Sequence, residues 1–184
     1  MAIIERPSTA VSELQVAAPA IPSTALGALK RPVTASGWRS WVFTVDHKKL
    51  GIMYSATALF FFIVGGLEAV LIRLQLAAPN GKVLNADLYN QMFTMHATTM
   101  VFLFVMPMAA GLANYFVPLQ IGARDVAFPR INAFGFWAFL FGGIFLNLAW
   151  FLGGAADGGW FMYAPNSGPV FSPSHGVDFW ALGL

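Results

Sequence analysis

The sequence predicts an all-α integral membrane protein, and three observations support this fold class. Hydrophobic residues make up 58% of the 184 residues, and the mean hydropathy is +0.67. Charged residues make up only 10%, whereas typical soluble proteins carry about 25%. The apolar residues gather into runs of about 20, the length that a helix needs to cross the hydrocarbon core of a bilayer. The sequence contains no cysteine, which excludes disulfides and thiolate metal sites, and nothing in it indicates a nucleic-acid partner.

Three complete apolar runs and the beginning of a fourth follow one another along the chain. They cover about residues 50–72, 93–117 and 131–152, with the fourth starting at 177. The turn residues Pro79-Asn80-Gly81, a polar loop at 118–130 and a glycine-rich stretch after residue 152 separate them. Half a span cannot satisfy its backbone in lipid alone. We therefore expect residues 38–184 to form three complete helices and the start of a fourth, in a sequence that is either incomplete or completed by another chain.

Residues 1–37 have a different composition, rich in Ala, Pro, Ser and Thr, and show no helical period. We expect this segment to be a disordered tail. Pro19 and Pro22 interrupt its only mildly apolar patch, and no charged start precedes that patch. A cleaved signal peptide is therefore not expected.

The basic residues predict the orientation of the chain in the membrane. Eight of them precede the first span or lie between the second and third spans: Arg6, Lys30, Arg31, Arg39, Lys48, Lys49, Arg124 and Arg130. Only Arg73 and Lys82 fall on the opposite side. Cytoplasmic loops carry the excess of lysine and arginine, so the N-terminus is predicted to be cytoplasmic.

His96, inside the second span and near its outer end, is the first candidate for chemistry. An intramembrane histidine is either hydrogen-bonded to a neighbouring helix or serves as an axial ligand, since neutral imidazole is a common ligand of heme iron. Ionisable groups are costly in a membrane and mark functional sites by default. Taken alone, the residue leaves both interpretations open.

Four further polar residues also admit two interpretations each. Arg73 closes the first span and is either a functional cation or an arginine snorkelling to the interface. Asp125 lies in the inner loop and is either an uptake group or part of a solvated ion pair with Arg124. Asn114 and Asn132 flank that loop and either hold waters leading inward or bond neighbouring helices.

Several stretches together resemble subunit I of the heme-copper terminal oxidases. They are DHKKLG at 46–51, TMH at 94–96, the long segment 114–134, and the glycine-rich segment 153–160 with Tyr163 after it. The resemblance covers residues 38–184 and implies a bundle of about twelve helices in the whole subunit, of which this chain holds the N-terminal part.

The resemblance also implies roles for individual residues. His96 matches an axial ligand of the low-spin heme, and Arg73 matches the arginine that hydrogen-bonds the formyl group of that heme. Trp160 matches a loop tryptophan near a heme propionate. Asp125 matches the mouth of a proton-uptake path from the cytoplasm, with Asn114 and Asn132 as its first polar steps.

The chain also departs from the family pattern. Many members have proline at the position of Arg124, and Gln75 stands where some use a carboxylate for a structural cation. The quinol-oxidising branch uses an arginine, a carboxylate and a histidine where this chain has Val64, Glu68 and Leu88. Only the carboxylate is kept, so cytochrome c is the expected electron donor.

The resemblance therefore implies part of the catalytic subunit of a bacterial cytochrome c oxidase, a proton-pumping oxidoreductase of aerobic respiration. The expected cofactor is a low-spin heme of the heme a type. A high-spin heme and copper belong to the full-length subunit, and their ligands lie outside these residues, so the fragment alone is not catalytic. The expected partners are subunits II and III, cytochrome c and membrane lipid, in the bacterial cell (inner) membrane.

Three alternatives stay open at this point: a ubiquinol-oxidising enzyme, a heme-free proton channel or transporter, and a non-catalytic membrane scaffold. Two histidines receive no metal role. His47, which precedes the first span in a basic segment, is interpreted as a wet capping or interface residue, and His175 is placed in the outer loop.

Overall fold

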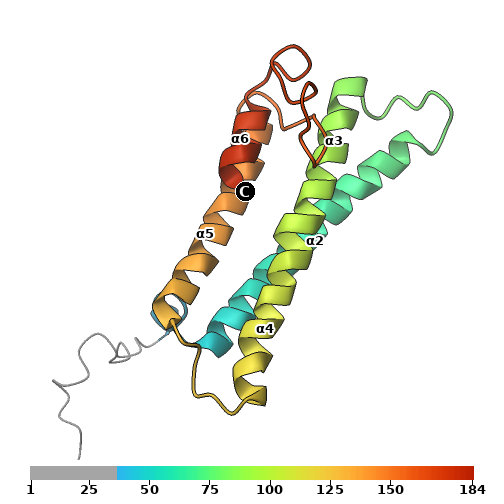
Figure 1. Ribbon diagram of the computed structural model, residues 1–184. Helices are drawn as coiled ribbons and strands as arrows, with labels where there is room; N and C mark the ends of the chain where they lie inside the picture. Colours follow the sequence, from blue (N-terminus) through green and yellow to red (C-terminus); the bar gives the residue numbers. More distant parts are fainter. Residues whose placement is uncertain (1–36) are drawn as a thin grey trace, which may run out of the picture. The chain divides into compact units, whose positions relative to one another are not determined.

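The computed structural model describes residues 37–184, and the expected disordered tail falls almost entirely on residues 1–36, outside the described part. Within that part every regular element is a helix (Figure 1). In chain order they are α1 (Arg39–Val42), α2 (His47–Gln75), α3 (Ala86–Thr98), the π-helix η2 (Thr99–Val105), α4 (Met106–Gln120), α5 (Pro129–Leu148), the 3-10 turn η3 (Ala149–Phe151) and α6 (Gly176–Gly183).

Three continuous helical segments are long and apolar enough to cross a membrane. They are His47–Gln75 with 29 residues, Ala86–Gln120 with 35 residues and Pro129–Phe151 with 23 residues. Much of their apolar surface is exposed in this chain, including Phe60, Ile63 and Leu67 on α2. The prediction of an all-α chain with three spans is therefore confirmed.

Capping explains why α2 is longer than the apolar run that predicted it. The Asp46 side chain accepts a hydrogen bond from the Lys48 amide at 2.8 Å, so the helix begins at His47 instead of residue 50. At the other end the Gln75 amide donates to the Gly81 carbonyl at 2.6 Å and accepts from the Leu84 amide at 2.7 Å. These two bonds fasten the connection from α2 to α3.

The second span changes its helical type in the middle. Residues Thr99–Val105 form a π-helix, and Pro107 follows as the second residue of α4. Proline has no amide hydrogen, and its ring clashes with the carbonyl four residues before it. The wider π turns accommodate this clash while the chain stays helical, and such segments are frequent at functional sites.

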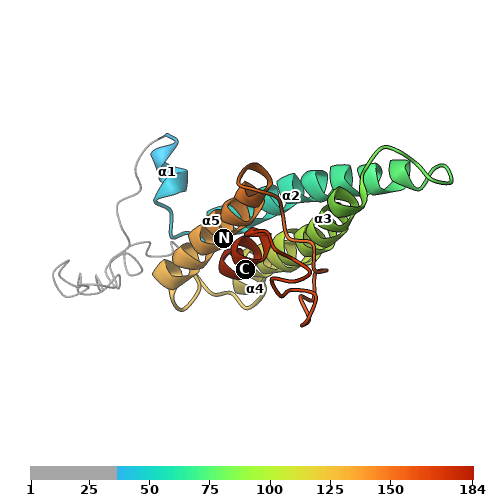
Figure 2. The same cartoon turned by 90° about the horizontal axis from the view of Figure 1, so that it is seen from above.

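Close backbone contacts at glycine hold the helices together. A Cβ added at Gly51 of α2 would lie 2.8 Å from the carbonyl oxygen of Gly111 on α4. Because hydrophobic burial does not drive helix association in lipid, membrane helices rely on this kind of close packing between small residues. In both views α3 runs beside α2 and α6 runs beside α5 (Figures 1 and 2).

The buried core consists of two clusters. One holds Leu50, Tyr54 and Phe136, between α2 and α5. The other joins six buried residues from α2, α3, η2, α5, η3 and the following loop: Phe61, Met95, Leu103, Leu146, Ala149 and Ala155. The first cluster lies near the start of α2, and the second packs around the helix that carries His96.

Candidate functional site

The His96 ring is fixed to helix α2 by one hydrogen bond. Its Nδ1 lies 2.8 Å from the carbonyl oxygen of Gly65. A carbonyl only accepts hydrogen bonds, so Nδ1 carries the proton and Nε2 keeps its lone pair. Gly65 permits this approach, because a Cβ there would lie 3.3 Å from Thr99 and 3.4 Å from Met100.

The helix that carries His96 begins earlier than the apolar run that predicted the second span. The run starts at residue 93, about one turn before His96, whereas α3 begins at Ala86, ten residues before it. At ~1.5 Å per residue this corresponds to about 15 Å of helix. The polar residues Asp87, Asn90 and Gln91 hid the first turns of this helix from the hydropathy pattern.

The opposite face of α3 holds the glycine-rich loop. Thr94, two residues before His96, accepts a hydrogen bond from the Gly159 amide at 2.9 Å. Gln91 accepts from the Ala155 amide at 3.0 Å. Residues two apart on a helix differ by about 200° in direction, so one face of α3 anchors the loop while the other presents His96 to α2.

Trp160 lies in this loop, directly after the anchored Gly159. Its ring is 41% exposed and lies 6.3 Å from the ring of Phe102 in η2, measured between centroids. The loop thus holds Trp160 beside the same span that carries His96. The family-derived role of Trp160 near a heme propionate remains a prediction.

Arg73 lies in the last turn of α2 with its side chain exposed. It is eight residues beyond Gly65, which is about 12 Å along the helix. The structure therefore places Arg73 and His96 toward the end of the helices where α2 connects to α3, without bringing the two residues into contact. Exposure alone fits both the snorkelling and the heme-binding interpretations.

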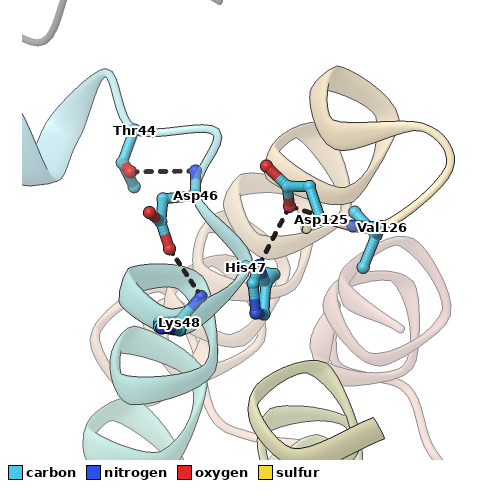
Figure 3. A network of polar contacts seen from close by, with 6 residues as sticks. All are labelled: Thr44, Asp46, His47, Lys48, Asp125 and Val126. Atoms are coloured by element: carbon cyan, nitrogen blue, oxygen red, sulfur yellow. Dashed lines mark hydrogen bonds and ion pairs between the residues drawn. The ribbon is translucent and has the colours of Figure 1, made fainter. Parts of the chain in front are cut away.

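Asp125 makes contacts that its interpretation as part of a solvated ion pair did not predict. Its Oδ1 lies 3.1 Å from His47 Nδ1 and accepts the Val126 amide at 2.9 Å (Figure 3). Its side chain is only 11% exposed. Asp125 thus joins the loop between α4 and α5 to the first residue of α2.

His47 is the residue whose surroundings differ most from the sequence interpretation. The segment around it is basic, and this suggested a wet capping or interface residue, but His47 is buried at 2% exposure and Asp46 is the cap. Its Nε2 is buried without a hydrogen-bond partner among the described residues. The signal for its burial in the sequence was its position seven residues before Tyr54, a spacing that puts both residues on the same face of a helix.

Asn114 and Asn132 lie on the two helices that flank the Asp125 loop. Asn132 is in the first turn of α5, and its buried Nδ2 has no partner among the described residues. Asn114 is half-buried near the end of α4. Neither side chain forms a direct hydrogen bond with Asp125 within residues 37–184, so a connection between them would need bridging water.

The two groups of candidates lie at opposite ends of the helices. The α4–α5 loop with Asp125 is at the bottom of Figure 1, and the α2–α3 connection and the loop after α5 are at the top. Arg73 is in the last turn of α2, His96 is in α3 and Trp160 is in the loop after α5, whereas His47 is the first residue of α2 and contacts Asp125 in the α4–α5 loop. The chain thus separates a polar mouth at one end from an imidazole site toward the other.

The geometry of His96 fits an axial ligand of heme iron. Ligating histidines almost always donate their second ring N–H to a carbonyl or carboxylate, which fixes the ring and its tautomer. The Gly65 carbonyl does this for His96. Residues 37–184 contain no group of three or more His, Asp or Glu placed to hold a metal ion by themselves, so in this part of the chain a single axial histidine is the metal ligand to consider.

The sequence matches the family model described as Cytochrome C and Quinol oxidase polypeptide I over residues 49–184. It is 58% identical over 144 residues to cytochrome c oxidase subunit 1 of Bacillus subtilis (strain 168), covering 78% of this chain and 23% of that protein. The subunit 1 of Bacillus sp. (strain PS3) is 55% identical over 157 residues, covering 85% of this chain and 25% of the relative. That of Corynebacterium efficiens is 51% identical over 152 residues, with coverage of 80% and 26%.

The chain thus spans about a quarter of the length of these relatives. The family match takes in nearly all of the three spans and includes His96, Arg73, Trp160, Asp125, Asn114 and Asn132, while His47 lies two residues before it. The chain belongs to the cytochrome c and quinol oxidase polypeptide I family.

Proposed function

We propose that this chain is the N-terminal part of the catalytic subunit of a bacterial cytochrome c oxidase, which reduces dioxygen to water and moves protons across the membrane. The observation that carries the proposal is the His96 ring, held by the Gly65 carbonyl at 2.8 Å with its Nε2 lone pair kept for iron. A packing histidine would make the same hydrogen bond, and the match to the oxidase family over residues 49–184 favours iron as the partner of that lone pair.

His96 is the residue of this chain that would hold a low-spin heme, with Arg73 near its formyl group and Trp160 near a propionate. When bound, that heme, of the heme a type, carries single electrons from the donor to a heme-copper pair. His96 holds its proton on Nδ1, and the glycine-rich loop anchored on Thr94 and Gln91 covers the other face of the same helix. The ligands of the heme-copper pair belong to the remaining part of the subunit.

Asp125 is the proposed point of proton uptake, with Asn114 and Asn132 as the first polar steps inward. The polar mouth lies at the end of the helices where the positive-inside rule puts the cytoplasm. This orientation gives a cytoplasmic N-terminus and an outer face that carries Arg73. In this arrangement protons are taken up on one side of the membrane, and the imidazole site lies toward the other side. Net movement of protons across the membrane requires such a separation.

Cytochrome c is the proposed donor, with subunits II and III as neighbours in the cell membrane. The similar proteins from Bacillus and Corynebacterium are named as cytochrome c oxidases. The chain also keeps only Glu68 of the three side chains expected for a quinol pocket. Both observations favour a protein donor over ubiquinol.

Replacement of Asp125 tests proton uptake in the complete membrane complex that contains this chain. An amide cannot exchange protons, so Asp125→Asn should lower oxygen consumption per heme by about 100-fold, the lower range for loss of a positioned acid or base. The hemes should still be reduced by the donor. Arg124→Ala keeps the carboxylate and should cause only a small loss, which makes it the matched control. Full turnover and unchanged proton pumping in the Asp125→Asn complex would exclude Asp125 as the uptake group.

A further inference from the structure

The contact between His47 and Asp125 links two parts of the chain that are 78 residues apart in sequence. His47 opens helix α2, and Asp125 lies in the loop that joins α4 to α5. Figure 3 shows the imidazole ring turned toward the carboxylate. The contact fixes the position of the proposed uptake group relative to the first span.

The backbone around His47 is itself immobilised, so the ring is a rigid support. Thr44 Oγ1 accepts from the Asp46 amide at 3.1 Å, and Asp46 in turn caps α2 through the Lys48 amide (Figure 3). Leu50, one turn later, is fully buried. With 2% exposure, the His47 ring has little room to change its rotamer.

Two of the contacts that Asp125 makes act on the same carboxylate oxygen. Oδ1 accepts from His47 Nδ1 and from the Val126 amide. Since a carboxylate only accepts while it is ionised, Nδ1 carries the hydrogen of this bond. Two donors from different directions set the orientation of the carboxylate as well as its position.

Stability alone gives a poor account of this arrangement. Burial of His47 leaves Nε2 without a hydrogen-bond partner among the described residues, and such a group lowers stability. The chain contains a second His–Asp pair for comparison, His175 and Asp178, whose side chains are 82% and 71% exposed. Exposed pairs of that kind contribute little, whereas the side chains of His47 and Asp125 are only 3% and 11% exposed.

We propose that His47 is the positioning residue for proton uptake, holding the Asp125 carboxylate at the mouth of the path through Nδ1. This inference rests on the proposed function of Asp125. His47 acts through Asp125, so any side chain that places an N–H where Nδ1 lies should preserve the effect. Asparagine does so, because its amide nitrogen is attached to Cγ as Nδ1 is in histidine.

Oxygen consumption and proton uptake per heme in the complete complex test the proposal, with four variants side by side. His47→Leu fills the same space without a donor and should lower both rates about tenfold, less than the ~100-fold that displacing a reacting group by 1 Å can cost. His47→Asn should restore most of the wild-type rate. His175→Leu removes the exposed pair and should leave both rates unchanged.

The fourth variant, Asp125→Asn, separates failure of the inference from failure of the proposed function. If it abolishes turnover while His47→Leu has no effect, Asp125 is the uptake group and His47 does not position it. If His47→Asn is as slow as His47→Leu, the donor to Asp125 is not what matters, and the positioning role is excluded. If Asp125→Asn is fully active, the proposed function itself is wrong. The heme content of each variant confirms that the complex has assembled.

Discussion

His96 and Asp125 are held by the same helix, although they belong to different parts of the chain. The Gly65 carbonyl orients the His96 ring, and His47 orients the Asp125 carboxylate. Both partners lie on α2, separated by 18 residues (65 − 47), or about 27 Å of helix. At the scale of single residues, α2 is therefore the common scaffold of the two proposed sites.

Arg73 provides the residue-scale prediction for the heme site. A guanidinium near the formyl group withdraws electron density, which raises the reduction potential and shifts the absorption band to longer wavelength. Arg73→Met in the complete complex should move that band to shorter wavelength and lower the potential. Ligation by His96 should stay intact in a redox titration followed by visible spectroscopy. If neither quantity changes, Arg73 only marks the membrane interface.

Sequence reasoning singled out His96, Asp125 and the two asparagines as candidates because polar groups near apolar runs stand out. It missed the environment of His47, since burial there depends on a loop 78 residues away. The basic neighbours Lys48 and Lys49 suggested that His47 is exposed. Lys48 is in fact exposed, whereas His47, directly before it, is buried. Adjacent residues on a helix point about 100° apart, so local composition could not decide this case.

At the scale of helices, apolar length predicted which segments cross the membrane, and capping decided where they end. α2 extends three residues beyond each end of its apolar run, from residues 50–72 to His47–Gln75. The π-helix Thr99–Val105 was not predicted, because Pro107 indicates a disturbed helix without specifying how the backbone adapts. Its position, three residues after His96, came only from the structure.

The contact between α2 and α4 yields a prediction for helix packing. In Gly51→Ala the new Cβ would lie 2.8 Å from the Gly111 carbonyl and 3.0 Å from Tyr115 Cβ, so the helices must separate. Overpacking of this kind typically costs about 1–3 kcal/mol, and the melting temperature of the detergent-solubilised complex should fall. Gly66→Ala on the same helix meets nothing within 4 Å. It should leave the melting temperature unchanged or raise it, since alanine favours helix by up to about 1 kcal/mol over glycine. Equal melting temperatures for the two variants would contradict the close contact.

At the scale of the whole molecule, the account needs the polar mouth and the α2–α3 connection on opposite sides of the membrane. Because these 184 residues contain no cysteine, a thiol introduced at one position reports the side of its loop when its labelling is compared with that of the unsubstituted protein. Lys82→Cys, in the α2–α3 connection, should react with an impermeant thiol reagent added to intact cells. Ala127→Cys, exposed in the α4–α5 loop, should react only after the membrane is opened. Labelling in the reverse order would overturn the orientation and the direction of proton uptake with it.

The visible spectrum of the complete complex shows whether His96 binds heme iron as proposed. His96→Ala removes the imidazole that Gly65 holds in place, and the low-spin heme band of the reduced-minus-oxidised spectrum should disappear. His175→Ala, which removes an exposed histidine, should leave that band intact, and retained copper would show that the His96→Ala complex has assembled. An assembled His96→Ala complex with an unchanged low-spin band would contradict the account and leave His96 as a packing residue.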